Sequence, residues 1–134
     1  MNAATAIYSK LSTTAGITAI VGTAIRPEYQ RGDLFPRIIY TVDNDEATLT
    51  HDGPSGLRMA TITVQSMART YAQALDIATA VKAALDWQSG TWGGVTVQKC
   101  VYKTQTEQEL TPADLGEAGR ALLISQTFDL WYQG

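Results

Sequence analysis

The stretch that decides the fold reads LRMATITVQSMARTYAQALDIATAVKAALD and covers residues 57–86. Its first part, from Leu57 to Ala68, alternates between two faces with a period of two residues, which is typical of a β-strand. One face holds Ala60, Ile62, Val64, Ser66 and Ala68, and the other holds Met59, Thr61, Thr63, Gln65 and Met67. The strand passes almost directly into a helix, so a sheet and a helix are joined within a few residues.

The start of that helix is marked by Thr70-Tyr71-Ala72-Gln73, a capping box with a hydroxyl at the N-cap and an amide three residues later. Behind it, apolar side chains recur at helical spacing and form one stripe through residue 86. We therefore expect this helix to pack on one face of the sheet. The expected contact residues are Tyr71, Leu75, Ala78, Val81 and Leu85, with Ala74 on the same stripe.

Upstream of the strand, the pattern predicts two short helices and a hairpin. Helical spacing of apolar residues predicts a helix over 4–11, and Thr13 or Thr14 can cap a second helix that ends at Gly22. A brief strand at 23–26 and a loop over 27–36 precede a strand from Arg37 to Asp43, which can continue to His51. Turn-forming residues at 51–56 predict the hairpin loop.

Downstream of the helix, residues 88–94 are rich in glycine and predict a turn that holds Trp92. A strand follows in which Val95, Val97 and Val101 share one face. Residues 104–119 are polar and acidic and predict a long loop, and a last strand is expected from Arg120 to Tyr132. The inward face of that strand is expected to hold Leu122, Ile124, Phe128, Leu130 and Tyr132, interrupted by Gln126.

The predicted order is α-α-(β)-β-β-α-β-β, in which turns join neighbouring strands. This order favours an α+β fold, a two-layer sandwich of an antiparallel sheet with helices packed on one face. A length of 134 residues fits a single domain over 1–134. Helices would then cover only one face, so the other would expose Trp131, Leu123 and the methionines as a partner surface, unless loop 27–36 folds over it.

Composition excludes several classes of protein. Hydrophobic residues make up 45% of the chain and the net charge is −3, so the chain is expected to fold and lacks the basic surplus of a nucleic-acid binder. One cysteine, Cys100, and one histidine, His51, exclude a disulfide and a site built on two imidazoles. No apolar run approaches a membrane span and no targeting signal is visible, so we expect a soluble cytoplasmic protein.

The sequence gives little support for a catalytic or ligand-binding site. The acidic run Asp43-Asn44-Asp45-Glu46 lacks the glycine and the distal glutamate of a calcium loop, so a solvated strand end is favoured and no metal is expected. His51, Asp52 and Ser55 are the residue types of a hydrolytic triad, but the G-x-S-x-G spacing is missing. Nothing near Cys100 in the sequence lowers the pKa of its thiol, so a packed thiol is favoured over a nucleophile.

Nucleotides and nucleic acids are not expected either. The glycine clusters match no phosphate-binding motif, and Gly90-Thr91-Trp92-Gly93-Gly94 leads into a strand rather than a helix. Lys99 and Lys103 flank Tyr102 on one strand, but two lysines in an acidic chain favour a solvated face. We therefore expect no cofactor and no sequence-specific nucleic-acid partner.

Several segments, taken in order, carry a family resemblance. A helix is followed by Ala19-Ile20-Val21-Gly22 and by a short strand ending at Arg26-Pro27. Phe35-Pro36-Arg37-Ile38-Ile39-Tyr40 and the loop Asp52-Gly53-Pro54-Ser55-Gly56-Leu57-Arg58 come next, and a strand then runs into Tyr71-Ala72-Gln73-Ala74. Over most of residues 4–103 the chain resembles the tail completion proteins, also called tail terminator or head–tail joining proteins, of long-tailed bacteriophages and prophages. Residues 104–119 depart from the shorter connection expected in that family.

The resemblance implies an α+β fold, no enzymatic activity and assembly as a six-fold ring in the virion tail or neck. Such a ring caps the tail tube and stops its growth, and it offers a surface to the head connector or head-closure protein. Assembly would take place in the bacterial host cytoplasm. Two alternatives stay open: another neck component such as a head-closure protein, and a small cytoplasmic enzyme that uses Asp43, Asp45, His51 or Cys100.

In a ring subunit, the partner contacts are expected from the acidic hairpin 43–57 and the acidic loop 104–119, because polar loops have little reason to fold inward. Basic groups of an adjoining subunit or connector would face them. The expected contact residues are Asp45, Glu46, His51, Asp52, Ser55, Glu107, Glu109, Asp114 and Glu117, with Arg26, Arg31 and Arg37 as basic counterparts.

Overall fold

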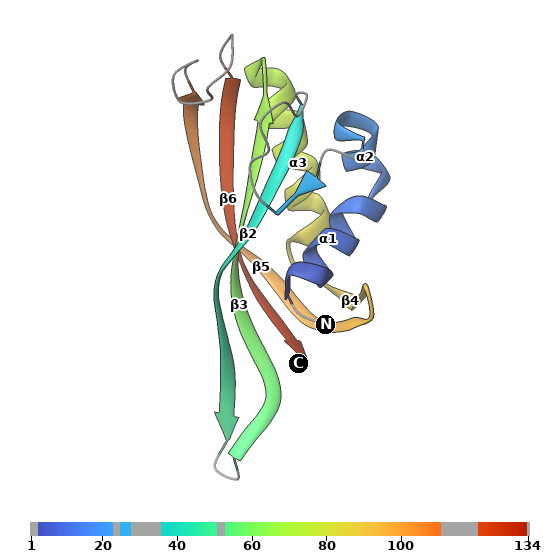
Figure 1. Cartoon of the computed structure of the whole chain (residues 1–134), viewed down its shortest axis with the longest axis vertical. Helices are drawn as coiled ribbons and strands as arrows, with labels where there is room; N and C mark the ends of the chain where they lie inside the picture. Colours follow the sequence, from blue (N-terminus) through green and yellow to red (C-terminus); the bar gives the residue numbers. More distant parts are fainter. Residues whose placement is uncertain (1–2, 23–24, 28–35, 51–52, 111–120, 134) are drawn as a thin grey trace.

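The computed structural model describes residues 3–22, 25–27, 36–50, 53–110 and 121–133. Six strands form one sheet in the order β1-β2-β3-β6-β5-β4, and the helices pack on one of its faces (Figure 1). The expected α+β sandwich is confirmed. The elements are α1 (Ala3–Thr13), α2 (Ala15–Val21), β1 (Ile25–Arg26), β2 (Arg37–Thr50), β3 (Gly53–Ala68), α3 (Tyr71–Leu85), β4 (Gln88–Trp92), β5 (Val95–Leu110) and β6 (Ala121–Gln133).

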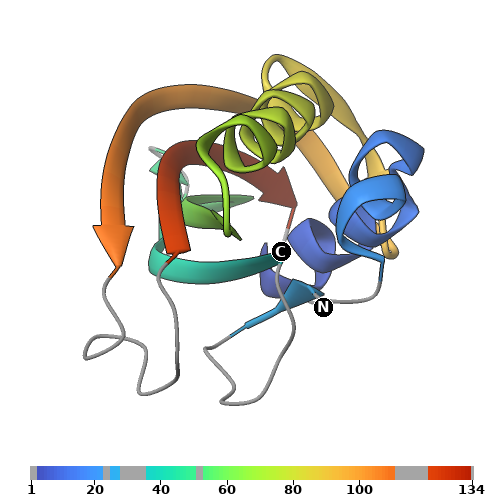
Figure 2. The same ribbon diagram turned by 90° about the horizontal axis from the view of Figure 1, so that it is seen from above.

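The centre of the sheet is the antiparallel pair β3 and β6, which stay in register from Leu57 opposite Gln133 to Ala68 opposite Leu122. β2 flanks β3, and β5 and β4 follow on the other side of β6, all antiparallel to their neighbours. Only β1 departs from the antiparallel pattern among the described strands, because Ile25 and Arg26 pair in parallel with Ile38 and Ile39. The sheet curls around the helices when it is seen from above (Figure 2).

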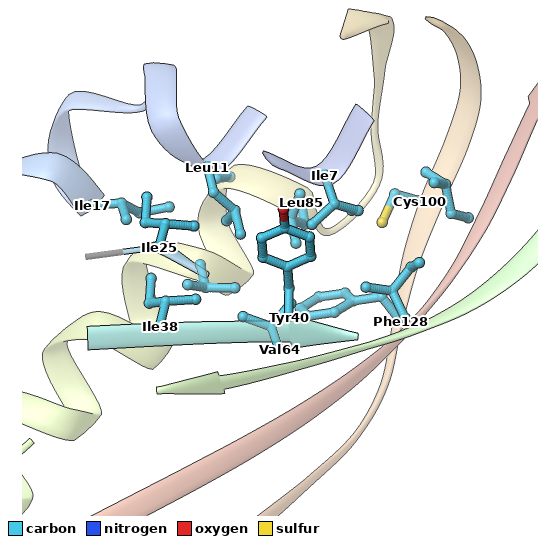
Figure 3. Close-up of a cluster of buried hydrophobic side chains, with 14 of the residues drawn as sticks. Ile7, Leu11, Ile17, Ile25, Ile38, Tyr40, Val64, Leu85, Cys100 and Phe128 are labelled. Atoms are coloured by element: carbon cyan, nitrogen blue, oxygen red, sulfur yellow. The ribbon is translucent and has the colours of Figure 1, made fainter. Parts of the chain in front are cut away.

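The core lies between the helices and the inner face of this curved sheet. Ile7 and Leu11 of α1 meet Tyr40 of β2, and Phe128 of β6 lies below them (Figure 3). The inward residues expected for β3 are all buried, as are those of β6 except Leu122, which is partly buried. The alternation of these two central strands was therefore predicted correctly from the sequence.

One buried polar side chain, Gln126 of β6, interrupts the apolar face. Its amide nitrogen donates to the backbone oxygen of Ala78 in α3 at 3.0 Å and to Oε1 of Gln105 in β5 at 3.2 Å. Buried polar groups are costly without such partners. The amide therefore ties α3 to the sheet at one position along the helix.

The N-cap of α3 is confirmed, because the backbone N–H of Gln73 donates to the hydroxyl of Thr70 at 3.3 Å. The prediction of which face of α3 packs on the sheet was partly wrong, because Tyr71 and Leu75 lie outside the buried face. Leu75 is 37% exposed and Tyr71 is about half exposed, where Tyr71 Oη donates to the Glu107 carboxylate at 3.4 Å. The buried face of α3 instead combines three alanines with three larger aliphatic side chains: Ala74, Ile77, Ala78, Val81, Ala84 and Leu85.

Two strands reach further than the sequence predicts. β2 runs to Thr50, within its expected continuation to His51, and 51–52 lie outside the described residues. β3 starts at Gly53, so residues 53–56 are strand where a hairpin loop was expected. β5 runs to Leu110, so the first part of the expected loop 104–119 is strand paired with β6, and 111–120 lie outside. Cross-strand hydrogen bonding extended these strands although their residues are polar.

The expected turn 88–94 is a hairpin of β4 and β5. Gly93 and Gly94 form its bend with φ of 60° and 83°, and a Cβ on Gly93 would lie 2.9 Å from Cβ of Ser9 in α1. β5 also shifts register between Val97 and Lys99, which turns Cys100 inward. The prediction that Val101 shares a face with Val95 and Val97 is therefore wrong, since a β-bulge breaks the alternation.

The two N-terminal helices and the brief strand after them are confirmed. Gly22 ends α2 with a φ of 62°, as a C-terminal glycine should. Thr14 is the N-cap of α2, but its hydroxyl donates backward to the Lys10 carbonyl at 2.6 Å rather than into α2. Loop residues 28–35 and residues 23–24 lie outside the described chain. No helix in the described ranges is long and apolar enough to cross a membrane.

The burial of α3 gives a direct test of the corrected packing. Ile77→Ala should lower the free energy of unfolding by about 2–5 kcal/mol, because a buried isoleucine leaves a cavity. Leu75→Ala should cost less than about 1 kcal/mol, because Leu75 already meets solvent. Urea unfolding of the two variants beside the unaltered chain measures both values. Equal losses would contradict the orientation of α3.

Candidate interaction surfaces

The β2–β3 hairpin forms an arm that leaves the body of the protein. We use "arm" for residues 47–50 and 53–56, the ends of β2 and β3, which are joined by the pairs Leu49–Pro54 and Thr50–Gly53. Residues 53–56 of β3 lie beyond Leu57, which pairs with the last described residue of β6, Gln133. Figure 1 shows the arm extending past the helices and past the end of β6. A two-stranded ribbon without a third strand is marginally stable by itself. The arm is therefore supported from its base.

Three side chains from three strands hold that base. Asp45 of β2 accepts hydrogen bonds from Arg58 Nε of β3 at 3.0 Å and from the Tyr132 hydroxyl of β6 at 2.5 Å. Burial, and then the bond to Asp45, raise the pKa of Tyr132 above its usual value. The phenol therefore stays protonated and can donate at any physiological pH.

β2 shifts register on both sides of this cluster, between Val42 and Asn44 and again between Ala47 and Leu49. Such bulges bend a strand and re-aim its side chains. At the first shift, Thr41 donates to the Asp43 carboxylate at 3.2 Å and Thr63 donates to it as well. Asp43 and Asp45 thus belong to two separate hydrogen-bond networks.

The face of the sheet opposite the helices is less apolar than expected. A row of threonines crosses it, with Thr41 opposite Thr63, Thr63 opposite Thr127 and Thr127 opposite Thr104. At one end of that face, Ile39, Met67 and Leu123 form a second small buried cluster. At the other end, the ammonium of Lys99 stands 4.6 Å from the ring centroid of half-buried Trp131.

The prediction that this face exposes Leu123 and both methionines is therefore wrong in part. Leu123 and Met67 are buried, and Met59 and Trp131 are half-buried. Loop 27–36, the alternative cover, falls mostly outside the described residues.

Arg37 was predicted from the sequence to be a basic counterpart for the acidic loops, and the structure contradicts this prediction. Its side chain is 0% exposed, and its Nε donates to Sδ of Met67 at 3.4 Å. The alternation of β2 places Ile38 in the main core and Arg37 on the opposite face, where it packs within the sheet. A buried guanidinium is not available to a partner.

The other expected contact residues are placed unevenly. Asp45 is half-buried at the base of the arm, and Glu107 is exposed near the other end of the sheet. Glu46, Ser55 and Glu109 lie on described strands, but their side chains, like that of Arg26 in β1, are outside the described part. Arg31, His51, Asp52, Asp114 and Glu117 lie wholly outside it. The triad formed by His51, Asp52 and Ser55 is therefore not tested.

Cys100 lies in the core, and burial raises the pKa of its thiol to about 12, with smaller contributions from Asp86 and Asp129. A thiolate is the reactive form of cysteine. Elsewhere, no three His, Cys, Asp or Glu side chains gather at a possible metal site within the described ranges.

The two hydrogen-bond partners of Asp45 were not predicted from the sequence. Arg58 and Tyr132 are far apart in the chain, and only the register of β3 against β6 places them opposite each other. The inward alternation of β6 was a signal for Tyr132, but nothing in the sequence marks its hydroxyl as the support of the arm.

Removal of that hydroxyl should loosen the arm. Tyr132→Phe should lower stability by about 1 kcal/mol, because one hydrogen bond to a carboxylate is lost. Amide hydrogen exchange at residues 47–50 should speed up while α3 stays protected. Tyr8→Phe, on a half-exposed tyrosine of α1, serves as the control. Unchanged exchange in the arm would show that Tyr132 does not support it.

The buried thiol makes a second prediction. Native protein at pH 8 should not react with a disulfide reagent such as DTNB over many minutes, because almost none of the Cys100 thiol is ionised below a pKa of about 12. In concentrated guanidinium chloride the same thiol should react at once. Fast labelling of the native chain would place Cys100 at the surface.

Comparisons with known proteins agree with this architecture. The model of the family "Tail completion protein gp17" matches residues 5–115. A chain of the virion of a native gene transfer agent particle has the same fold, with a TM-score of 0.71 and 18% identity over 96% of this chain and 92% of that chain. The comparison with curated proteins gave no match. The chain belongs to the tail completion protein gp17 family and is a structural protein of bacteriophage tails.

Proposed function

We propose that the chain is the subunit of a six-fold ring in the virion neck that caps the tail tube and joins the tail to the head. It takes part as a structural element and performs no catalytic step. Family membership supports the tail completion role. The observation that carries the rest is the arm, a rigidly based projection that no described element of the same chain covers.

The shape of the sheet supports two axial contacts. The arm lies at one end of the strands, and the β5–β6 end, where Leu110 pairs with Ala121, lies at the other (Figure 1). A subunit between the tube and the head needs a contact surface at each end. The tail tube protein and a head connector or head-closure protein are the proposed partners.

The flanks of the sheet support a ring. A closed ring uses heterologous contacts, so each subunit needs two different surfaces. β2 with β1 forms one edge and β4 forms the other, and they differ in length and in composition. The particle would assemble in the cytoplasm of the bacterial host.

Shortening the arm tests the proposal. Residues 48–57 are replaced by Asn-Gly, so that the register pair Ala47 and Arg58 closes a two-residue hairpin and Asp45 keeps its partners. The variant should fold with a melting temperature close to that of the unaltered chain. Electron microscopy of the particles should show overlong tubes or unjoined heads and tails.

Leu75→Ala, an exposed truncation far from the arm, is the control and should give normal particles. Normal tail length and normal joining with the shortened arm would contradict the role given to it. Joined particles with overlong tubes would place the arm on the tube side, and unjoined particles with normal tubes would place it on the head side.

A further inference from the structure

Trp87 is the most exposed large apolar side chain among the described residues, with 70% of its surface in solvent. It is also the one non-glycine residue of the described chain with a positive φ, at 58°. Directly after a helix, a residue with a positive φ is usually glycine, and a bulky residue in this conformation carries backbone strain. Exposure and strain coincide on one residue, and such strain tends to gather at functional positions.

Hydrogen bonds on both sides hold the backbone at Trp87 in place. The backbone N–H of Trp87 donates to the Cys100 carbonyl of β5 at 2.7 Å, and the carboxylate of the preceding Asp86 accepts from the backbone N–H of Tyr102 at 3.0 Å. The indole thus stands at the start of β4, the edge strand, where the residues 88–91 are exposed. Tryptophan in a preorganised position is the residue type most often found at the energetic centre of an interface.

The opposite edge of the sheet offers a matching surface. β1 pairs only with Ile38 and Ile39, so no described strand covers the outer side of β2 from Tyr40 onward. Beside this edge lie Val42, 37% exposed, and Tyr8 of α1, 45% exposed, whose ring is 6.2 Å from that of Tyr40. An uncovered edge strand with apolar side chains is a template for pairing with another chain.

The two edges also differ in charge. All four lysines lie on the β4–β5 side: Lys10 stands over Trp92 of β4, Lys82 over Tyr102 of β5, and Lys99 and Lys103 are on β5. The β2 edge carries the exposed Asp43, while Asp45 is paired with Arg58 in its own chain. Lys103 is likewise paired with Asp129, so Lys10, Lys82 and Lys99 are left to steer the edge that carries Asp43.

We propose that Trp87 is the anchor of the contact between neighbouring copies in the ring, and that it binds the surface formed by Tyr8 and Val42 at the β2 edge of the next copy. This inference rests on the ring proposed above and names the residues that join its subunits. The contact is heterologous, because the anchor and its binding surface are different parts of the chain.

Cysteine cross-linking in assembled tails tests the contact. Ser89→Cys on β4 and Val42→Cys on β2 are made singly and together, and Cys100 stays silent because its thiol is buried. After mild oxidation, the double variant should give a ladder of cross-linked species up to the full ring. Each single variant should stay monomeric, and co-assembly of the two single variants should give dimers. Thr79→Cys with Val42→Cys is the control pair and should give no ladder.

The outcomes separate the inference from the proposed function. A visible ring at the tail end without cross-links in the double variant overturns the Trp87 contact and leaves the ring standing. Dimers from Ser89→Cys alone would show a two-fold contact and also overturn it. Tails without any ring of this chain would overturn the proposed function itself.

Trp87→Gly tests the anchor by itself. Because glycine accepts a positive φ without strain, the melting temperature should stay within about 3 °C or rise. The amount of chain incorporated in tails should fall at least tenfold, while Leu75→Ala incorporates normally. A clearly lower melting temperature would show that the indole serves the fold, and normal incorporation would show that it is not the anchor.

Discussion

The structure depends on the pairing of β3 with β6. These two strands lie at the centre of the sheet, stay in register over twelve residue pairs and bring one inward apolar row from each beneath the helices. A shift by one residue would turn both rows outward, so burial fixes the register. The position of Tyr132 opposite Arg58, at the base of the arm, follows from this register.

Much of this centre could be predicted from the sequence, because period-two alternation is a local signal. Val64 and Phe128 face inward as expected, and the Thr70 cap begins α3 at the expected residue. The buried face of α3 was harder to predict from the sequence, since Leu75 and Ile77 are both large and apolar. Only the packing of α3 against the sheet decides which of the two side chains is buried. The periodicity alone cannot choose between them.

The polar ends of the strands could not be predicted, for a different physical reason. Residues 104–110, and Gly53 and Pro54, have the composition of loops, yet each pairs with a neighbouring strand. The same is true of Arg37, whose charge suggested exposure although its place in β2 buries it. Of the expected contact residues, the strand register aligns Asp45 with Leu130 of β6, through Ala60, and Glu107 with Ile124 of β6. Trp87 drew no attention in the sequence, because its backbone conformation has no local signature.

The buried amide of Gln126 gives β6 a mechanical role. The strand is fastened to α3 at Ala78 by this amide and to the arm at Asp45 by the Tyr132 hydroxyl. A densely packed interior deforms little, so a strand fastened at two points acts as a strut. If a particle component docks on the arm as proposed, β6 would carry the load from Asp45 into the helical layer at Ala78, so the base of the arm would not act as a free hinge.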